Sequence, residues 1–102
     1  MVFYIYILYS EIADKYYVGS SQDPWRRLVQ HNHTPLTTFT SKYRPWILKA
    51  VFRTNLSRGD SQQLERFIKR QKSRALLIKL IDPDFIPDGK LAKLVRVPQL
   101  RD

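Results

Sequence analysis

The sequence predicts a small α/β (α+β) domain, with a mainly antiparallel three-stranded sheet flanked by helices in the order β-β-α-β-α-α. Two observations carry this prediction. Runs of β-branched and aromatic residues, typical of strands, occur near the amino terminus and in the middle of the chain, and helix-like segments with apolar residues three or four apart follow them. The chain has 102 residues and is 43% hydrophobic, which is enough apolar material for the core of one domain.

A β-hairpin is predicted at the amino terminus. Residues 2–9 are almost entirely β-branched, aromatic or apolar, a polar turn follows, and residues 16–20 form a second strand-like run. Side chains alternate between the two faces of a strand, so Tyr17 and Gly19 share one face of the second strand. Because glycine has no Cβ, we expect Gly19 to let a phosphate approach the backbone closely. The first strand divides its side chains between two faces, with Phe3, Ile5 and Ile7 on one and Tyr4, Tyr6 and Leu8 on the other.

The dipeptide Asp23-Pro24 predicts the start of a helix. An aspartate can cap the free amides of the first turn, and proline suits the first helical position. Asn32 suits the end of this helix. Arg27 and His31 are four residues apart and therefore lie on one flank of it. We expect its apolar stripe to consist of Trp25, Leu28 and Val29.

The second half of the chain predicts one more strand and two helical segments. In order, these are a polar loop over 33–44, a strand over 46–52, and helices over 61–71 and 73–81. Ser57 or Asp60 can cap the first of these helices, and the second either continues or restarts it. The periodic pattern ends at residue 81, so we expect a folded domain over 1–81 and a carboxy-terminal tail of uncertain structure over 82–102.

The chain is strongly basic. It has 18 Lys and Arg against 9 Asp and Glu, a formal net charge of +9, and residues 57–81 alone hold seven basic residues against Asp60 and Glu65. An excess this concentrated favours a polyanionic partner, nucleic acid before anionic lipid. The alternative is a charged helix face that only keeps the protein in solution.

Composition also excludes several classes of protein. The chain has no cysteine, which rules out disulfide scaffolds, thiolate zinc sites and cysteine nucleophiles. No apolar run approaches the roughly 20 residues of a membrane span. The amino terminus lacks the basic start and small-residue cleavage site of a signal peptide. We therefore expect a cytoplasmic protein with no membrane partner.

Five polar residues of the predicted elements can supply the chemistry that cuts a phosphodiester bond. Hydrolysis needs a hard oxygen ligand for a divalent cation, a positive group for the phosphate charge, and a group that deprotonates water. Glu65 could supply the first, Arg27 the second, and Tyr6, Tyr17 or His31 the third. Each has an ordinary explanation as well, as a sheet aromatic, a surface arginine, an incidental helical histidine, or a glutamate paired with the lysine four residues on. Composition and spacing alone predict a basic α/β domain that binds nucleic acid.

The ordered set of these residues resembles the GIY-YIG nuclease family. The first motif is Tyr4-Ile5-Tyr6 here and the second is Tyr17-Val18-Gly19; an arginine follows ten residues after the second-motif tyrosine, and a histidine four further on. The similarity covers about residues 3–81, and segments 40–46 and 64–69 resemble small, stand-alone members. The resemblance implies the GIY-YIG nuclease fold and a relation to the nuclease domain of the bacterial excision-repair incision subunit.

Two positions depart from the family pattern. Tyr4 stands where the first motif has its glycine, although the tyrosine two residues on is present. Several members use an asparagine after the glutamate-bearing helix, and this chain has no asparagine beyond Asn55.

The resemblance implies a metal-dependent endonuclease that hydrolyses phosphodiester bonds in DNA, in repair, recombination or DNA processing, with Mg²⁺ or Mn²⁺ as cofactor. Tyr6, Tyr17, Arg27 and His31 would then be catalytic, and Glu65 would bind the metal. The resemblance leaves open which of Tyr6, Tyr17 and His31 activates the water. The nucleic-acid contacts are expected on the basic surface, at Arg26, Lys42, Arg44, Lys69, Arg70 and Lys72.

Two alternatives stay open at this point. One is a non-catalytic nucleic-acid-binding module that retains the nuclease fold. The other is an adaptor whose basic face docks on an acidic protein. The sequence does not distinguish single-stranded, duplex or branched DNA, or DNA from RNA, and it leaves the oligomeric state open.

Overall fold

A four-stranded antiparallel sheet in the order β2-β1-β3-β4 forms the centre of the molecule. The computed structural model describes residues 1–33 and 40–98, and residues 34–39 of the predicted loop lie outside the described part. The elements in chain order are β1 (Phe3–Ser10), β2 (Lys15–Ser21), α1 (Pro24–His33), the 3-10 turn η1 (Thr40–Tyr43), β3 (Trp46–Thr54), α2 (Arg58–Arg70), α3 (Arg74–Ile81), the 3-10 turn η2 (Gly89–Leu91) and β4 (Val95–Arg96).

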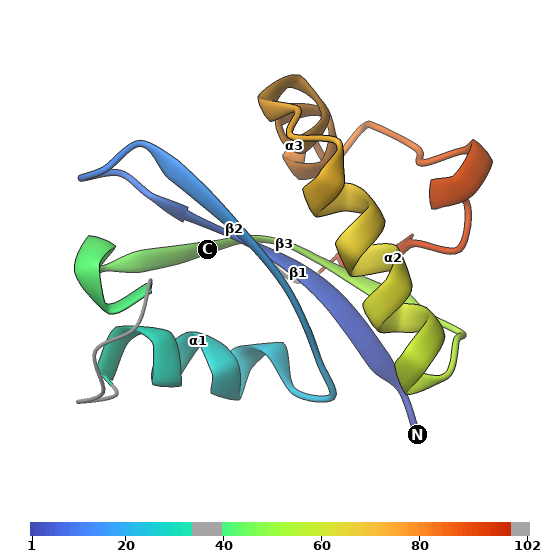
Figure 1. Cartoon of the computed structure of the whole chain (residues 1–102), viewed down its shortest axis with the longest axis horizontal. Helices are drawn as coiled ribbons and strands as arrows, with labels where there is room; N and C mark the ends of the chain where they lie inside the picture. The colour runs from blue at the N-terminus through green and yellow to red at the C-terminus, as the bar shows by residue number, and fades with distance from the viewer. Residues whose placement is uncertain (34–39, 99–102) are drawn as a thin grey trace.

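Helices cover both faces of this sheet (Figure 1). Helix α1 lies against one face, and α2 and α3 lie against the other. Strand β1 pairs with β2 on one side and β3 on the other, so it is central and buried on both faces. This explains why residues 2–9 are apolar or aromatic almost without interruption. The predicted mainly antiparallel sheet flanked by helices is confirmed.

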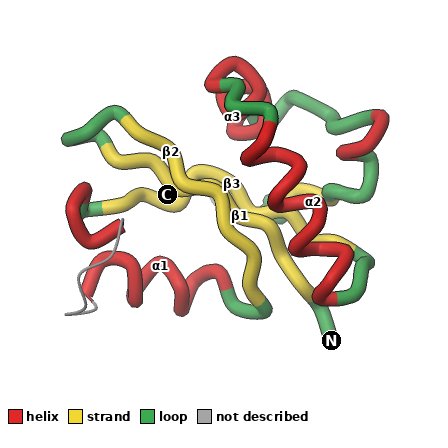
Figure 2. Tube along the Cα trace, in the orientation of Figure 1, coloured by secondary structure: helices red, strands yellow, loops and turns green. Residues whose placement is uncertain are grey.

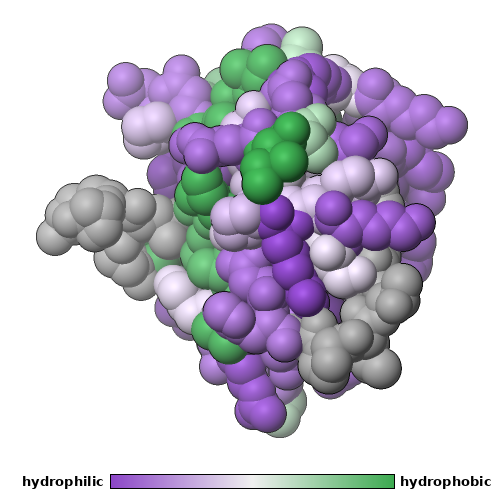
Figure 3. All heavy atoms as spheres, turned by 90° about the vertical axis from the view of Figure 1, so that its left-hand side faces the viewer, coloured by the Kyte–Doolittle hydropathy of each residue, from purple (hydrophilic) through white to green (hydrophobic). Residues whose placement is uncertain are grey.

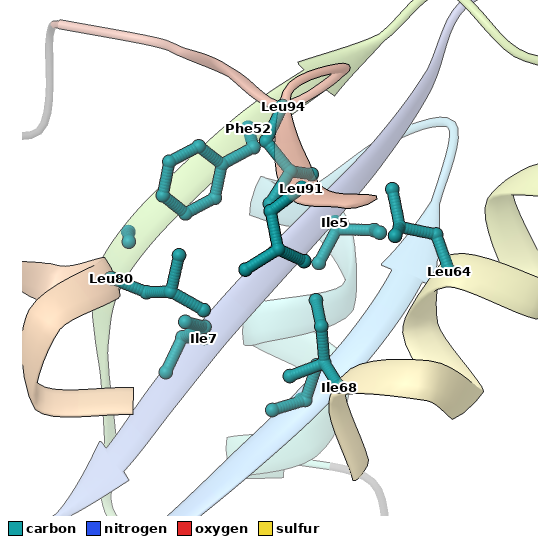
Figure 4. Packing of buried hydrophobic residues seen from close by; sticks show 10 residues of the cluster. Ile5, Ile7, Phe52, Leu64, Ile68, Leu80, Leu91 and Leu94 are labelled. Atoms are coloured by element: carbon teal, nitrogen blue, oxygen red, sulfur yellow. The ribbon is translucent and has the colours of Figure 1, made fainter. Parts of the chain in front are cut away.

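The face under α2 and α3 holds an aliphatic core (Figure 4). Ile5 and Ile7 of β1 point to this face, as the alternation predicts, and neither is exposed. The helices α2 and α3 and the segment that follows α3 cover these isoleucines. The buried residues of this cluster are Ile5, Ile7, Val18, Ala50, Phe52, Leu64, Ile68, Leu80, Leu91 and Leu94.

The face under α1 holds a smaller and more aromatic cluster. Its buried members are Tyr6, Leu8, Trp46 and Val51, and Leu28 of α1 packs against them. The predicted stripe of α1 is wrong at Trp25 and Val29, which are 38% and 56% exposed. The helix turns Pro24, Leu28 and His31 toward the sheet instead. These three residues are spaced four and three apart, which is one face of a helix.

Serine caps separate the two helices of the carboxy-terminal half. The Ser57 side chain accepts a hydrogen bond from the amide of Asp60, so α2 begins three residues before the predicted helix. The Ser73 side chain does the same for α3 by accepting from the amide of Leu76. Lys72 between them has a φ of +47°, a left-handed conformation that ends the first helix. Figure 2 shows the resulting bend, so α3 restarts rather than continues α2.

The segment after α3 adds a fourth strand that the three-stranded prediction omits. Arg96 of β4 pairs with Phe52 of β3, and its guanidinium lies over the Phe52 ring, 4.7 Å from the centroid. Two residues are too few for alternation to be visible in the sequence. Leu91 and Leu94 of the same segment reach the aliphatic core, as noted above. No helix in the described ranges is long and apolar enough to cross a membrane.

Candidate active site

The predicted catalytic residues gather along the edge strand β2. Tyr6 of β1 and Tyr17 of β2 are diagonal neighbours on one face of the hairpin, with ring centroids 6.4 Å apart. His31 of α1 packs against both rings, at centroid distances of 6.0 Å from Tyr6 and 4.9 Å from Tyr17. Arg27, one helical turn before His31, is close enough to affect the pKa values of both Tyr6 and His31. The spacing of four between Arg27 and His31 therefore has the predicted effect of placing them together.

A buried chain of hydrogen bonds holds Tyr6 in place. The Tyr6 hydroxyl lies 3.0 Å from His31 Nε2, and His31 Nδ1 lies 2.9 Å from the Thr40 hydroxyl. Tyr6 is 1% exposed and His31 is 6% exposed. The backbone carbonyl of Thr40 also accepts a hydrogen bond from the indole of Trp46, at 2.6 Å, which anchors η1 to β3. Sequence reasoning missed Thr40 as a site residue, because one threonine in a threonine-rich segment carries no signal of its own.

Burial sets the protonation of this pair. Burial, then the neighbouring Tyr17, raises the pKa of Tyr6 to about 12, and Arg27 opposes the shift. Burial lowers the pKa of His31 to about 4, and the positive charges of Arg27 and Arg44 act in the same direction. At neutral pH, His31 is therefore uncharged and Tyr6 keeps its proton, so one ring nitrogen of His31 is an acceptor for a hydrogen bond.

Gly19 is required by Tyr6. The two residues are paired across β1 and β2, and a Cβ built on Gly19 would lie 2.5 Å from both Cζ and the hydroxyl oxygen of Tyr6. Any side chain at this position would therefore displace a buried ring. The predicted role of Gly19, to give room to a phosphate, is not what the structure shows: the Tyr6 ring fills the space beside Gly19.

Glu65 reaches the same strand from the opposite face. The Ser20 hydroxyl of β2 donates to Glu65 Oε1 at 2.5 Å, and Lys69 Nζ lies 2.7 Å from Glu65 Oε2. The side chain of Glu65 is 16% exposed, and Lys69 extends over the Tyr17 ring, 5.1 Å from its centroid. The ordinary pairing of Glu65 with Lys69 thus exists in the structure and lies inside the candidate site. Sequence reasoning missed Ser20 as a site residue, because its role depends on a contact with a residue 45 positions away.

The residues present suit a hard divalent cation that keeps most of its water. Among the described residues, no group of three or more His, Cys, Asp or Glu could enclose a metal ion. Mg²⁺ is commonly bound by only one or two carboxylates together with water and substrate phosphate. Glu65, with the Ser20 hydroxyl beside it, fits such a site, provided that Lys69 leaves Oε2. Binding a cation there requires Lys69 to move.

The predicted nucleic-acid contacts separate into distinct groups. Lys69 and Lys72 line a cleft with Tyr17, whereas Arg70 lines a different cleft on the far side of α2. Arg44 donates to the backbone carbonyl of His31 at 2.6 Å, so it braces the end of α1. Lys42 is exposed on η1, and Arg26 lines a polar cleft with Arg27. Hydrophilic residues predominate on the side of the molecule shown in Figure 3.

The structure thus brings a buried tyrosine and histidine, an arginine and the partly buried carboxylate of Glu65 together around the strand β2. The family model of the GIY-YIG catalytic domain matches residues 2–77, and the chain belongs to the GIY-YIG endonuclease family. The expectation from the sequence motifs is confirmed.

A curated relative carries a more specific description. The "Structure-specific endonuclease subunit SLX1" of the yeast Meyerozyma guilliermondii is 36% identical to this chain over 74 residues. The match covers 68% of the chain and 25% of the relative, so the chain spans about a quarter of that protein's length.

Proposed function

We propose that this chain is a divalent-metal-dependent endonuclease that hydrolyses phosphodiester bonds in DNA. The observation that supports this most directly is the gathering of Tyr17, Arg27 and Glu65 around the edge strand β2, with the buried Tyr6 beside Tyr17. The family description and the description of the yeast relative point to the same chemistry. The net charge of +9 favours a polyanionic substrate.

In this proposal Glu65 holds the metal ion. Mg²⁺ or Mn²⁺, when bound, neutralises phosphate charge and lowers the pKa of a coordinated water. Arg27 binds two phosphate oxygens through its planar guanidinium and stabilises the charge that develops in the transition state. Tyr17, with Lys69 over its ring, positions the phosphate or the attacking water.

Tyr6 and His31 move the proton of the water. The Tyr6 oxygen accepts a hydrogen bond from the water while its own proton is shared with His31 Nε2. This arrangement requires the His31 tautomer in which Nδ1 carries the proton and donates it to the Thr40 hydroxyl. Because burial lowers the pKa of His31 to about 4, the histidine is neutral at neutral pH and can accept this hydrogen bond.

One observation favours the second candidate, a DNA-binding module without catalysis. Both oxygens of Glu65 are already engaged, one by Ser20 and one by Lys69. If Lys69 never leaves, no cation binds, and the basic surface only holds nucleic acid.

Cleavage assays separate the two candidates. Purified protein is incubated with labelled single-stranded, duplex and branched DNA in Mg²⁺, Mn²⁺ or EDTA. We expect cleavage that needs the metal and that Glu65→Gln abolishes, since the substitution removes the charge and keeps the shape. Undiminished cutting by Glu65→Gln would disprove the assignment of Glu65, and binding without cutting in every metal would favour the module.

A further inference from the structure

A polar cleft of about 440 Å³ lies next to the Glu65 site, and the proposed chemistry does not use most of it. It is formed where β2 ends and where α1 and α2 begin. Two of its lining residues, Ser20 and Arg27, also belong to the site. Whatever occupies this cleft therefore lies next to Ser20 and Arg27.

The cleft is built for an anion with a flat ring attached. Three arginines, Arg26, Arg27 and Arg58, line it against a single carboxylate, Asp23. One oxygen of Asp23 already caps α1 by accepting from the amide of Arg26 at 3.0 Å. The Arg58 guanidinium lies over the Phe3 ring, 5.5 Å from its centroid, which presents a cationic plane to the cleft. We call this space the arginine cleft.

Its contents suit a nucleotide better than a bare phosphate. Guanidinium and aromatic planes are the surfaces on which unpaired bases stack, and stacking tolerates any base. Three glutamine side chains of the lining add amide donors and acceptors. The volume, about 440 Å³, lies in the range of pockets that enclose one small organic molecule.

A second cleft continues the path on the other side of Glu65. It is about 530 Å³ in volume, and Tyr17, Lys69 and Lys72 line it. Ser20 in the arginine cleft and Tyr17 in the second cleft are three residues apart on β2, about 10 Å along the strand. Glu65 contacts Ser20 on one side and Lys69 on the other. A DNA strand that passes Glu65 along β2 thus meets a basic cleft in both directions.

We propose that the arginine cleft binds an unpaired nucleotide that flanks the scissile phosphate, so that the substrate must contain a single-stranded segment. This inference rests on the proposed function, because the scissile phosphate is placed by that function at Glu65.

The test measures binding in EDTA, where no cleavage occurs. The probes are a fluorescent six-residue thymidylate strand and a fully paired, blunt-ended duplex of two separate strands, each titrated at one fixed salt concentration. The variant is Arg58→Gln, and the matched control is Arg66→Gln. Arg66 lies on the same helix and carries the same charge, but it lines the cleft on the other side of α2. Arg58→Lys is a third variant that keeps the charge and loses the planar fork.

We expect Arg58→Gln to weaken binding of the single strand about tenfold, in line with the loss of one base-stacking contact. Arg66→Gln should weaken it by no more than about twofold, and Arg58→Lys should fall between the two. Binding of the duplex should respond equally to Arg58→Gln and Arg66→Gln. Equal losses for the single strand, or a selective loss for the duplex, would overturn the proposal.

A cleavage assay run in parallel keeps the two proposals apart. Suppose that the unmodified protein cuts DNA but Arg58→Gln and Arg66→Gln bind the single strand equally well. The arginine cleft is then not a nucleotide site, and the proposed endonuclease function is unaffected. If the binding difference appears but no metal supports cutting, the proposed function fails, and with it the placement of the nucleotide beside a scissile bond.

Discussion

The two faces of the sheet are packed by different chemistry. Under α2 and α3, branched aliphatic side chains such as Ile7 and Ile68 fill most of the space, and the hydroxyls of Thr54 and Ser61 are hydrogen-bonded to each other at 2.8 Å. Under α1, the buried groups include Tyr6, His31 and Thr40, which satisfy one another by hydrogen bonds. The first face stabilises the fold through apolar burial, while the second fixes the orientation of polar groups that the site needs. Changes on the two faces should therefore have different readouts.

The largest expected effect is on the aliphatic face. Ile7→Ala leaves a cavity in a fully buried position and should lower the free energy of unfolding by about 2–5 kcal/mol. Denaturant titration measures this loss. The milder Ile7→Val should cost about 0.5–1.5 kcal/mol and leave the DNA-cleavage rate of the folded protein unchanged. A lower cleavage rate in fully folded Ile7→Val protein would show that packing on the aliphatic face also affects the site.

The next effect lies on the α1 face and is kinetic. Arg27→Lys keeps the charge but cannot form paired hydrogen bonds to two phosphate oxygens, so cleavage should slow by about 10²–10³. The affinity for DNA should change little. A single-turnover cleavage rate beside a binding titration at the same salt checks both statements. Cleavage by Arg27→Lys at the parental rate would show that Arg27 does not act on the phosphate.

The buried histidine should make stability depend on pH. His31 has a pKa of about 4 in the folded chain and about 6.5 when unfolded, so the unfolded state binds the proton first as the pH falls. The contribution of neutral His31 to the free energy of unfolding is complete above about pH 6.5 and is lost between about pH 6.5 and 4. From pH 7 to pH 5, the parent should lose about 2 kcal/mol more stability than His31→Gln does. Parallel losses in the two proteins would show that His31 is not held neutral.

The smallest expected effect concerns the edge where the two faces meet. Lys69→Met frees one oxygen of Glu65, and a partly exposed pair of this kind contributes about 0.2–1 kcal/mol, so affinity for Mn²⁺ should rise by up to about fivefold. Calorimetric titration without DNA measures it. Arg66→Gln, on the far side of α2, is the control for the loss of one positive charge. Equal or weaker Mn²⁺ binding in Lys69→Met would mean that the lysine does not compete with the metal.

Local sequence signals were sufficient for the faces of β1 and for the caps of α1 and α2. The alternation of Ile5 and Ile7 with Tyr6 follows from the geometry of a strand, and the capping chemistry of Asp23 and Ser57 is local. The motif order was specific enough to bring Tyr6, Tyr17, Arg27 and His31 together.

Other features depend on contacts between distant parts of the chain. The rotation of α1, which exposes Val29, is decided by how Leu28 and His31 fit the sheet. Strand β4 exists because the edge of β3 is available, although its two residues have no pattern of their own. Ser20 contacts Glu65 across 45 residues. No local pattern encodes such pairings.

The contact between Gly19 and Tyr6 has a consequence for how this sequence can vary. The two residues are 13 positions apart in the chain, yet a methyl group at one would overlap the phenol of the other. A side chain at position 19 therefore forces the Tyr6 ring to shift unless position 6 holds a smaller residue, and a smaller residue there would remove the phenol from the site. The identities of the two positions thus constrain each other.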